Sequence, residues 1–214
     1  MMQILLCAAT SFEIASTIAF LKEKRIENID VLITGVGLTA ATYALTKAVC
    51  SKRPDLILQA GVAGCLDESL SLTKVVIVEH EVIADSGVIE NGSFQSLFDL
   101  GLANKQISPW KAGRLSNSIE ELKQTGLKFV NGITVNEITT NETRINFYRE
   151  QMLAQIETLE GAALHYVALS EGIKFLQIRS LSNFVGERDK NKWMLDAAIV
   201  NLNRELQHIL SKFF

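Results

Sequence analysis

The sequence has little of what marks secreted, nucleic-acid-binding or fibrous proteins. It contains only three cysteines and two prolines in 214 residues, and its 21 basic side chains are balanced by 24 acidic ones. Because Cys7, Cys50 and Cys65 are odd in number and scattered in apolar context, we expect packed thiols in a reducing compartment and no disulfide framework. No basic run is present, so we expect no nucleic-acid partner.

Long apolar runs are also missing. The N-terminal stretch QILLCAA has no Lys or Arg before its apolar residues, and its run is shorter than the roughly 7–15 residues of a signal core. We therefore interpret it as a buried first strand. No segment approaches the ~18 apolar residues of a membrane span. These absences predict a cytoplasmic protein with no membrane partner.

Short β-rich runs alternate with helical patterns along the chain. With 48% hydrophobic residues and no linker-like segment, the sequence predicts a single domain over residues 1–214. We expect a three-layer αβα sandwich around a central, mixed but largely parallel sheet. Strands are predicted at 3–9, 31–34, 55–60, 75–85 (bent or bulged), 129–140 and 174–181, and helices at 12–24, 38–52, 161–172 (with Gly172 as C-cap) and 193–213. We make no assignment for residues 86–126.

The last predicted helix carries an apolar stripe on one face. This spacing is more typical of core packing than of a partner site. The stripe consists of Leu195, Ile199, Leu202, Leu206, Ile209 and Phe213.

Four predicted elements end in unusual residues. AATSFE (8–13), TGVG (34–37), QAGVAG (59–64) and SLSN (180–183) each follow a strand signal. Ligands in α/β sheets bind beyond the carboxyl ends of the strands. We therefore expect these segments to form turns that meet around one site.

Three familiar kinds of site are not supported. GVGLTA (35–40) fits the dinucleotide pattern, but that pattern needs an acidic residue at the end of the next strand, and Asp55 instead begins one. His80, His165 and His208 are far apart and lack metal-ligand spacing. No nucleophile elbow is present. We expect no cofactor and no metal.

Two glutamates begin helices in positions suited to chemistry. Glu13 can be a capping-box residue that reaches back to Thr10, or a free carboxylate at the end of the first strand. Glu160 lies at a helix N-terminus, where a negative charge is favourable. The small residues 161–163 that follow would let this first turn pack tightly against the sheet and hold the carboxylate rigidly.

LEGAA (159–163) and IRSLSN (178–183) together resemble the nucleoside phosphorylase and nucleosidase superfamily. Its usual form is Met-Glu-Gly-Ala-Ala followed by a strand ending in Arg-x-x-Ser-Asp or Ser-Asn, so Leu159 replaces the common Met. The GVG and QAGVAG segments match in order and spacing, so the resemblance covers essentially the whole chain. Within the superfamily, VEHEVIADSGV, NGITVNEIT and above all SNFVGERDKNKW resemble the futalosine hydrolases.

The resemblance implies a role for each matching residue. Glu160 would accept hydrogen bonds from the ribose hydroxyls, and Glu13 would orient and deprotonate the attacking water. Asn183 would read the imidazole edge of the purine. Leu159, Ala63, Gly64 and Ser182 would contribute to substrate binding.

An amide at position 183 has a chemical consequence. Hypoxanthine presents two acceptors, N7 and O6, to which an amide NH₂ can donate, whereas a carboxylate would repel them. Ser182 would fix the amide orientation, although a cap or turn role for Ser182 is equally consistent. A flipped amide would instead present its oxygen to adenine, so the oxo and amino forms of the base stay open.

The strand ends carry no Arg or Lys for a phosphate dianion, so water is the expected nucleophile. The benzoate arm of futalosine needs an apolar wall and a cation. We expect FQSLFDLGL (94–102), from this or a neighbouring subunit, and Arg188 to supply them. Arg188 could instead pair with Glu187 or Asp189.

We therefore predict a homo-oligomeric N-glycosidase, a dimer or larger, that hydrolyses futalosine to hypoxanthine and dehypoxanthine futalosine in menaquinone biosynthesis. The alternatives are a methylthioadenosine/S-adenosylhomocysteine nucleosidase, a 6-amino-6-deoxyfutalosine hydrolase and a non-catalytic nucleotide-binding module.

Overall fold

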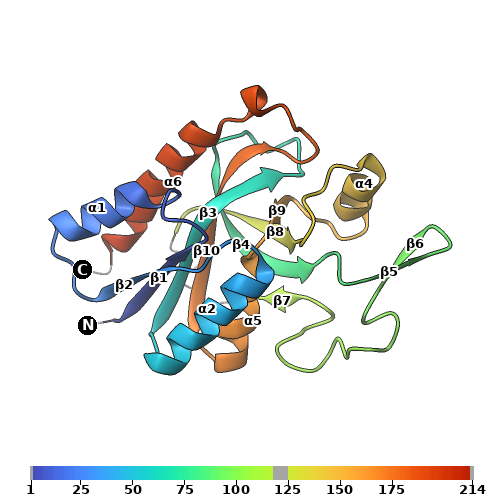
Figure 1. The fold of residues 1–214 in the computed structure, drawn as a ribbon, viewed down its shortest axis with the longest axis horizontal. Coiled ribbons are helices and arrows are strands. Elements are labelled where there is room, and N and C mark those ends of the chain that lie inside the picture. Colours follow the sequence, from blue (N-terminus) through green and yellow to red (C-terminus); the bar gives the residue numbers. More distant parts are fainter. Residues whose placement is uncertain (1, 118–124, 213–214) are drawn as a thin grey trace.

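The computed structural model describes residues 2–117 and 125–212, and Figure 1 shows helices arranged around a twisted sheet. The elements in chain order are β1 (Ile4–Ala8), α1 (Ala15–Glu23), β2 (Ile29–Ile33), α2 (Leu38–Ser51), β3 (Leu56–Cys65), β4 (Val75–Ile83), β5 (Gly87–Glu90), β6 (Ser93–Ser96), β7 (Leu115–Ser116), β8 (Lys128–Thr134), α4 (Glu142–Glu150), β9 (Ile156–Thr158), α5 (Gly161–Glu171), β10 (Lys174–Phe184), the 3-10 turn η1 (Lys190–Lys192) and α6 (Leu195–Leu210).

The main sheet is mixed and mostly parallel, and part of it closes on itself. β1 pairs in parallel with β2 and β3, and β3 pairs in parallel with β10. β4 joins β10 antiparallel and β8 in parallel, while β9 pairs in parallel with β8 and antiparallel with β3. The strands β3, β10, β4, β8 and β9 therefore form a ring. β7 adds to β4, and β5 and β6 form a separate hairpin that projects away from the sheet (Figure 1).

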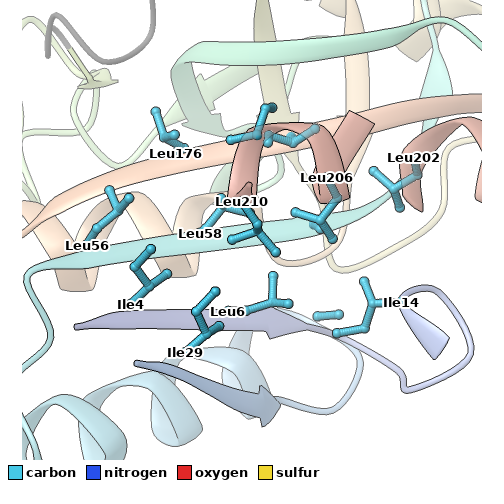
Figure 2. Close-up of a cluster of buried hydrophobic side chains, with 14 of the residues drawn as sticks. Ile4, Leu6, Ile14, Ile29, Leu56, Leu58, Leu176, Leu202, Leu206 and Leu210 are labelled. Atoms are coloured by element: carbon cyan, nitrogen blue, oxygen red, sulfur yellow. The ribbon is translucent and has the colours of Figure 1, made fainter. Parts of the chain in front are cut away.

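Helices cover both faces of the sheet. Alternate residues of β1 point to opposite sides, as the period of a strand requires. Leu6 packs into a cluster with α1 and α6, and Figure 2 shows Leu206 and Leu210 of α6 beside the strands. Leu5 packs instead into a cluster with α2 and α5. The burial of apolar side chains on each face holds the layers together.

Two predicted turns are strand instead. QAGVAG lies inside β3 and SLSN lies inside β10, because these two strands stay paired to Cys65 and Phe184. Glycine makes this extension possible. A Cβ at Gly61 would overlap the Arg179 guanidinium and come 2.9 Å from Glu13 Oε1, so only glycine leaves room for both side chains.

Most of the other predicted elements are confirmed, with shifted ends. β4 has a register shift between Val78 and His80, as the bent-strand prediction requires. Gly172 caps α5 in the left-handed conformation, with φ 62°. β8 ends at Thr134 rather than at 140, and α6 begins at Leu195. Phe213, predicted as the end of the stripe, lies outside the described residues.

The cysteine prediction was wrong at one position. Cys7 and Cys65 are buried free thiols, but Cys50 is exposed. The buried face of α2 is formed by Ala41, Leu45 and Val49, so the next residue along the helix points away from the core. Of the helices in the described ranges, none is both long and apolar enough to cross a bilayer.

Candidate active site

All eight predicted site residues line one cavity. It has a volume of about 340 Å³ and lies where β1, β3, β9 and β10 end, between the loops that follow them and the start of α6. The predicted residues in its wall are Glu13, Ala63, Gly64, Leu159, Glu160, Ser182, Asn183 and Arg188. Their co-location is thus a feature of the fold, while their chemical roles stay predictions.

Glu13 is buried and both of its oxygens accept hydrogen bonds. Oε2 accepts from the backbone N–H and the hydroxyl of Thr10, each at 3.0 Å. Oε1 accepts from the N–H of Val62 at 3.1 Å. The contact with Thr10 is the one that the capping-box interpretation predicts, but α1 begins only at Ala15. The carboxylate therefore bridges the loop after β1 and the extended part of β3, and it is held rigidly at the cavity wall.

Glu160 is held by the glycine loop and by a buried arginine. Its Oε1 accepts from the N–H of Gly37 at 2.9 Å, and its Oε2 lies 3.9 Å from Nη1 of Arg179. Gly37 has a φ of 93°, which favours glycine, so the GVG pattern serves a carboxylate of the protein itself. Arg179 donates to Gln59 Oε1 at 2.8 Å and is 1% exposed. It thus orients Glu160 from behind the cavity.

The first turn of α5 packs directly on a buried carboxyl group. A Cβ at Gly161 would overlap both Glu81 and Gln177. Glu81 accepts hydrogen bonds from Gln177 Nε2 at 2.9 Å and Thr134 Oγ1 at 3.1 Å. Burial raises the pKa of Glu81 to about 7, against the effect of these bonds. Tight packing of this turn, inferred from the small residues 161–163, is therefore confirmed.

Hydroxyl groups satisfy the N–H groups at the start of α5. Gly161 donates to Thr158 Oγ1 at 3.1 Å, and Ala162 donates to Thr134 Oγ1 at 2.8 Å. The Glu160 side chain makes no cap hydrogen bond to its own helix. Its carboxylate is consequently available to the cavity, because two threonines do the capping.

Asn183 has a fixed amide orientation. Its Nδ2 donates to the carbonyl oxygen of Phe184 at 2.9 Å, and its Oδ1 accepts from the Ser182 hydroxyl at 2.8 Å. A backbone carbonyl can only accept, so the atom that faces it must be the nitrogen. A flipped amide would set two acceptors against each other. In the described part of the chain, Phe184 is the one acceptor within hydrogen-bond distance of Nδ2.

Arg188 does not form the ion pairs that were its alternative. Its guanidinium lies over the ring of Trp193, 5.7 Å from the centroid. The Glu187 carboxylate pairs with Lys192 at 2.7 Å, and Asp189 accepts from Asn191. Arg188 is also the only Lys or Arg among the described residues that line the cavity.

The apolar wall differs from the predicted one. No residue of FQSLFDLGL is part of the cavity wall in this chain, because the segment begins inside β6 of the projecting hairpin and continues beyond it (Figure 1). The wall comes instead from residues that sequence reasoning missed or assigned elsewhere. They are Phe12, Val36, Ile138, Trp193, Leu195 and Ile199.

Leu195 and Ile199 correct the interpretation of the α6 stripe. Leu202, Leu206 and Ile209 are buried core residues, as predicted. The two residues at the start of the helix are only partly buried and line the cavity. The first residues of α6 therefore lie over the cavity and the later ones over the core. Glu157 and Thr139 also line the cavity and were not predicted.

The described part of the chain holds no group of three or more His, Cys, Asp or Glu side chains placed to bind a metal ion. His165 is fully buried, and burial lowers its pKa to about 3. Its Nδ1 lies 3.1 Å from the carbonyl oxygen of Leu115, so the neutral ring donates there. His165 is therefore a packed core residue.

Comparison with known proteins places most of the chain in one family. The model of the phosphorylase superfamily matches residues 25–214. A futalosine hydrolase from Thermus thermophilus is 28% identical over 187 residues, which covers 85% of this chain and 80% of the relative. A 5'-methylthioadenosine/S-adenosylhomocysteine nucleosidase from Geobacillus kaustophilus is 28% identical over 176 residues, covering 76% of this chain and 71% of the relative.

The fold is also that of solved nucleosidases. The structure of the 5'-methylthioadenosine/S-adenosylhomocysteine nucleosidase from Helicobacter pylori superposes with a TM-score of 0.82 at 16% identity, over 99% of each chain. The family match spans β2 to the C-terminus, and with it the LEGAA and SLSN segments that carry Glu160 and Asn183. The chain belongs to the phosphorylase superfamily.

Proposed function

We propose that this chain is a purine nucleosidase that hydrolyses the N-glycosidic bond of futalosine, releasing hypoxanthine and dehypoxanthine futalosine. The observation that carries the proposal is the shared cavity. Two buried carboxylates, Glu13 and Glu160, and one orientation-locked amide, Asn183, line it together. The futalosine hydrolases among its sequence relatives support the choice of substrate.

The reaction needs three separate tasks. Water adds to the anomeric carbon as the bond from that carbon to the purine nitrogen breaks, and the bonding electron pair leaves with the purine. Glu13 accepts the proton of the water, since its carboxylate is held by N–H and O–H donors on the cavity wall. Glu160 accepts hydrogen bonds from the ribose hydroxyls while Arg179 and Gly37 hold it. Solvent returns a proton to the purine anion.

Water is the nucleophile in this proposal. A phosphate dianion is bound by Arg, Lys and clustered backbone donors. The cavity wall has one such side chain in the described residues, Arg188, and it stacks on Trp193. Arg188 is therefore better placed to meet the carboxylate of a benzoate arm than to hold an attacking phosphate.

The amide of Asn183 favours a 6-oxopurine. Its second N–H can donate to an acceptor of the base, and the Phe184 carbonyl opposes the flip that would accommodate the adenine amino group. As the leaving base gains negative charge, a fixed donor stabilises it more than it stabilises the bound nucleoside. The runner-up substrates are methylthioadenosine and S-adenosylhomocysteine, as the relatives with that activity suggest.

The remaining features of the proposal are a single domain over residues 1–214, a three-layer αβα sandwich, a cytoplasmic location and a homo-oligomer. Apolar clusters on both sides of the sheet support the sandwich. The location and the oligomer stay predictions.

The test is purine release from futalosine, 6-amino-6-deoxyfutalosine and methylthioadenosine by the wild-type protein and by Glu13→Gln. We expect futalosine to be the preferred substrate and the variant to lose about 10²–10⁴-fold in kcat. The change in hypoxanthine affinity, measured by calorimetry, should be small. The matched control is Glu23→Gln, on the exposed side of α1.

Faster turnover of methylthioadenosine than of futalosine would contradict the proposed substrate. Equal turnover by the wild type and Glu13→Gln would contradict the proposed base. Ligand binding without turnover of any of the three nucleosides would identify a non-catalytic module instead.

A further inference from the structure

The loop between β10 and α6, residues 185–194, holds one arginine that has no carboxylate partner. It contains two acidic and three basic side chains, and both acids, Glu187 and Asp189, are neighbours of Arg188 along the chain. Arg188 nevertheless forms no ion pair with a carboxylate in the described part of the chain. It is exposed and lines the cavity. The loop therefore presents an unpaired positive charge at the mouth of the cavity.

Other groups of the same loop occupy both acids. Glu187 Oε2 accepts from Lys192 Nζ at 2.7 Å, and Glu187 Oε1 accepts from the N–H of Asp189 at 2.8 Å. The hydrogen bond between them lowers the pKa of Glu187 and raises the pKa of Lys192, so both groups stay charged at neutral pH. Asp189 Oδ1 accepts from the N–H and from Nδ2 of Asn191, each at 3.0 Å. Lys192 thus takes the carboxylate that Arg188 could otherwise bind.

An aromatic ring supports Arg188 instead. Its guanidinium lies over the ring of Trp193, 5.7 Å from the centroid. The ring is itself fixed, because Trp193 Nε1 donates to the carbonyl oxygen of Glu187 at 3.1 Å and the N–H of Met194 donates to the carbonyl oxygen of Ser182 at 2.8 Å. A guanidinium on an aromatic face keeps its N–H groups free to donate, and their planar arrangement matches a carboxylate.

The wall around this cation is apolar. Phe12, Val36, Leu195 and Ile199 line the same cavity, and Arg188 is the only Lys or Arg with them in the described residues. A ligand group that matches this combination has an apolar body and a carboxylate at its end. The benzoate arm of futalosine is such a group.

We propose that Lys192 is a positioning residue: by occupying Glu187, it keeps Arg188 free to bind the carboxylate of the benzoate arm. This inference rests on the proposed function and adds the means by which the site selects an anionic substrate. Glu187 also lines the cavity, so without Lys192 its carboxylate would compete with the substrate for Arg188. A substrate with an uncharged arm gains nothing from Arg188, so the loop separates substrates by the charge of the arm.

The test compares futalosine with its methyl ester, which keeps the aromatic ring and loses the negative charge. In the wild type, KM for the ester should be about 10-fold higher than KM for futalosine. Lys192→Met should raise KM for futalosine about 2- to 5-fold with kcat unchanged, and it should not change KM for the ester. Lys190→Met is the matched control. It removes the same charge from the same loop, and Lys190 is exposed and does not line the cavity, so both KM values should stay as in the wild type.

A second substitution distinguishes this role from general support of the loop. In the double variant Glu187→Gln with Lys192→Met, the new amide still accepts from the N–H of Asp189 but has no charge to pair with Arg188. We expect KM for futalosine to return to about the wild-type value. In an Arg188→Met background, Lys192→Met should have no further effect on KM, because the two residues act through one interaction. A KM that stays raised in the double variant would overturn the role of Lys192.

Failure of the inference is distinguishable from failure of the proposed function. If the wild type hydrolyses futalosine and the Lys192→Met and Lys190→Met variants have the same KM, the role of Lys192 is wrong and the nucleosidase stands. If the wild type hydrolyses futalosine and its methyl ester with equal KM, Arg188 does not bind the carboxylate and the inference fails alone. If the wild type releases a purine from neither compound, the proposed function fails and this inference fails with it.

Discussion

At the scale of single residues, the wall of the cavity around Asn183 depends on a short run of three residues. The Ser182 hydroxyl donates to Asn183 Oδ1, and the Phe184 carbonyl accepts from Asn183 Nδ2. The Phe184 carbonyl, which can only accept, excludes the flipped amide that adenine would need, and the Ser182 hydroxyl supports the observed orientation. The sequence left that flip open, and only the position of the Phe184 carbonyl removes it.

Ser182→Ala should weaken this orientation without removing it. We expect kcat/KM for futalosine to fall about 3- to 10-fold, since one of the two hydrogen bonds that fix the amide is lost. The measurement is hypoxanthine release under initial-rate conditions. Ser180→Ala removes a buried hydroxyl on the same strand that bonds to the Thr73 carbonyl outside the cavity. It should leave the substrate preference unchanged, and equal effects of the two substitutions would contradict the role of Ser182.

At the scale of secondary-structure elements, helix α5 places Glu160 by close packing of its first turn. Gly161 lies against Glu81 and Gln177, and the threonines at 134 and 158 cap the turn. The start of the helix is thus fixed in place. Glu160, the residue before it, contributes its carboxylate to the cavity wall.

Gly161→Ala should therefore damage both stability and activity. The new methyl group would overlap buried polar groups, so we expect a loss of about 1–3 kcal/mol in the free energy of unfolding, measured with urea. Activity per folded molecule should fall because the turn carrying Glu160 must move. Gly172→Ala, at the other end of α5, has φ 62° and open space around it. It should cost about 1 kcal/mol with normal activity, and similar activities for the two variants would refute this account.

The sequence predicted these elements well but not their lengths. Runs of apolar residues marked β1, β4, α2 and α5, because buried elements concentrate such residues. This signal failed at QAGVAG and SLSN, which contain turn-forming residues and yet are strand. Tertiary pairing of β3 with β10 overrides local preference there, and no local pattern reports that pairing.

At the scale of the whole molecule, two buried titratable groups, Glu81 and His165, should affect the free energy of unfolding in opposite directions as the pH changes. The folded-state pKa of Glu81 is raised from 4.5 to about 7, so its stabilising contribution is fully present below pH 4.5 and is lost as pH rises to 7. The folded-state pKa of His165 is lowered from 6.5 to about 3, so its contribution is present above pH 6.5 and is lost as pH falls.

The substitution Glu81→Gln removes the contribution that is lost as pH rises. The free energy of unfolding of the variant, minus that of the wild type, should increase by about 2 kcal/mol between pH 5 and pH 7. Urea denaturation at pH 5, 6 and 7 measures this difference, with the exposed Glu23→Gln as reference. A difference that stays constant over this range would mean that Glu81 is ionised throughout in the folded protein.

The sequence by itself determined the chemical groups and most of the elements that carry them. Glu13, Glu160 and Asn183 stand beside recognisable strand signals, and the LEGAA and SLSN segments identify the superfamily. Only the tertiary structure decided which groups share a wall. Glu157, Gly64 and Asn183 are distant in sequence and meet through the register of three strands. Strand register is set by long-range packing, so the sequence could name the amide but not the residues that lie beside it on the cavity wall.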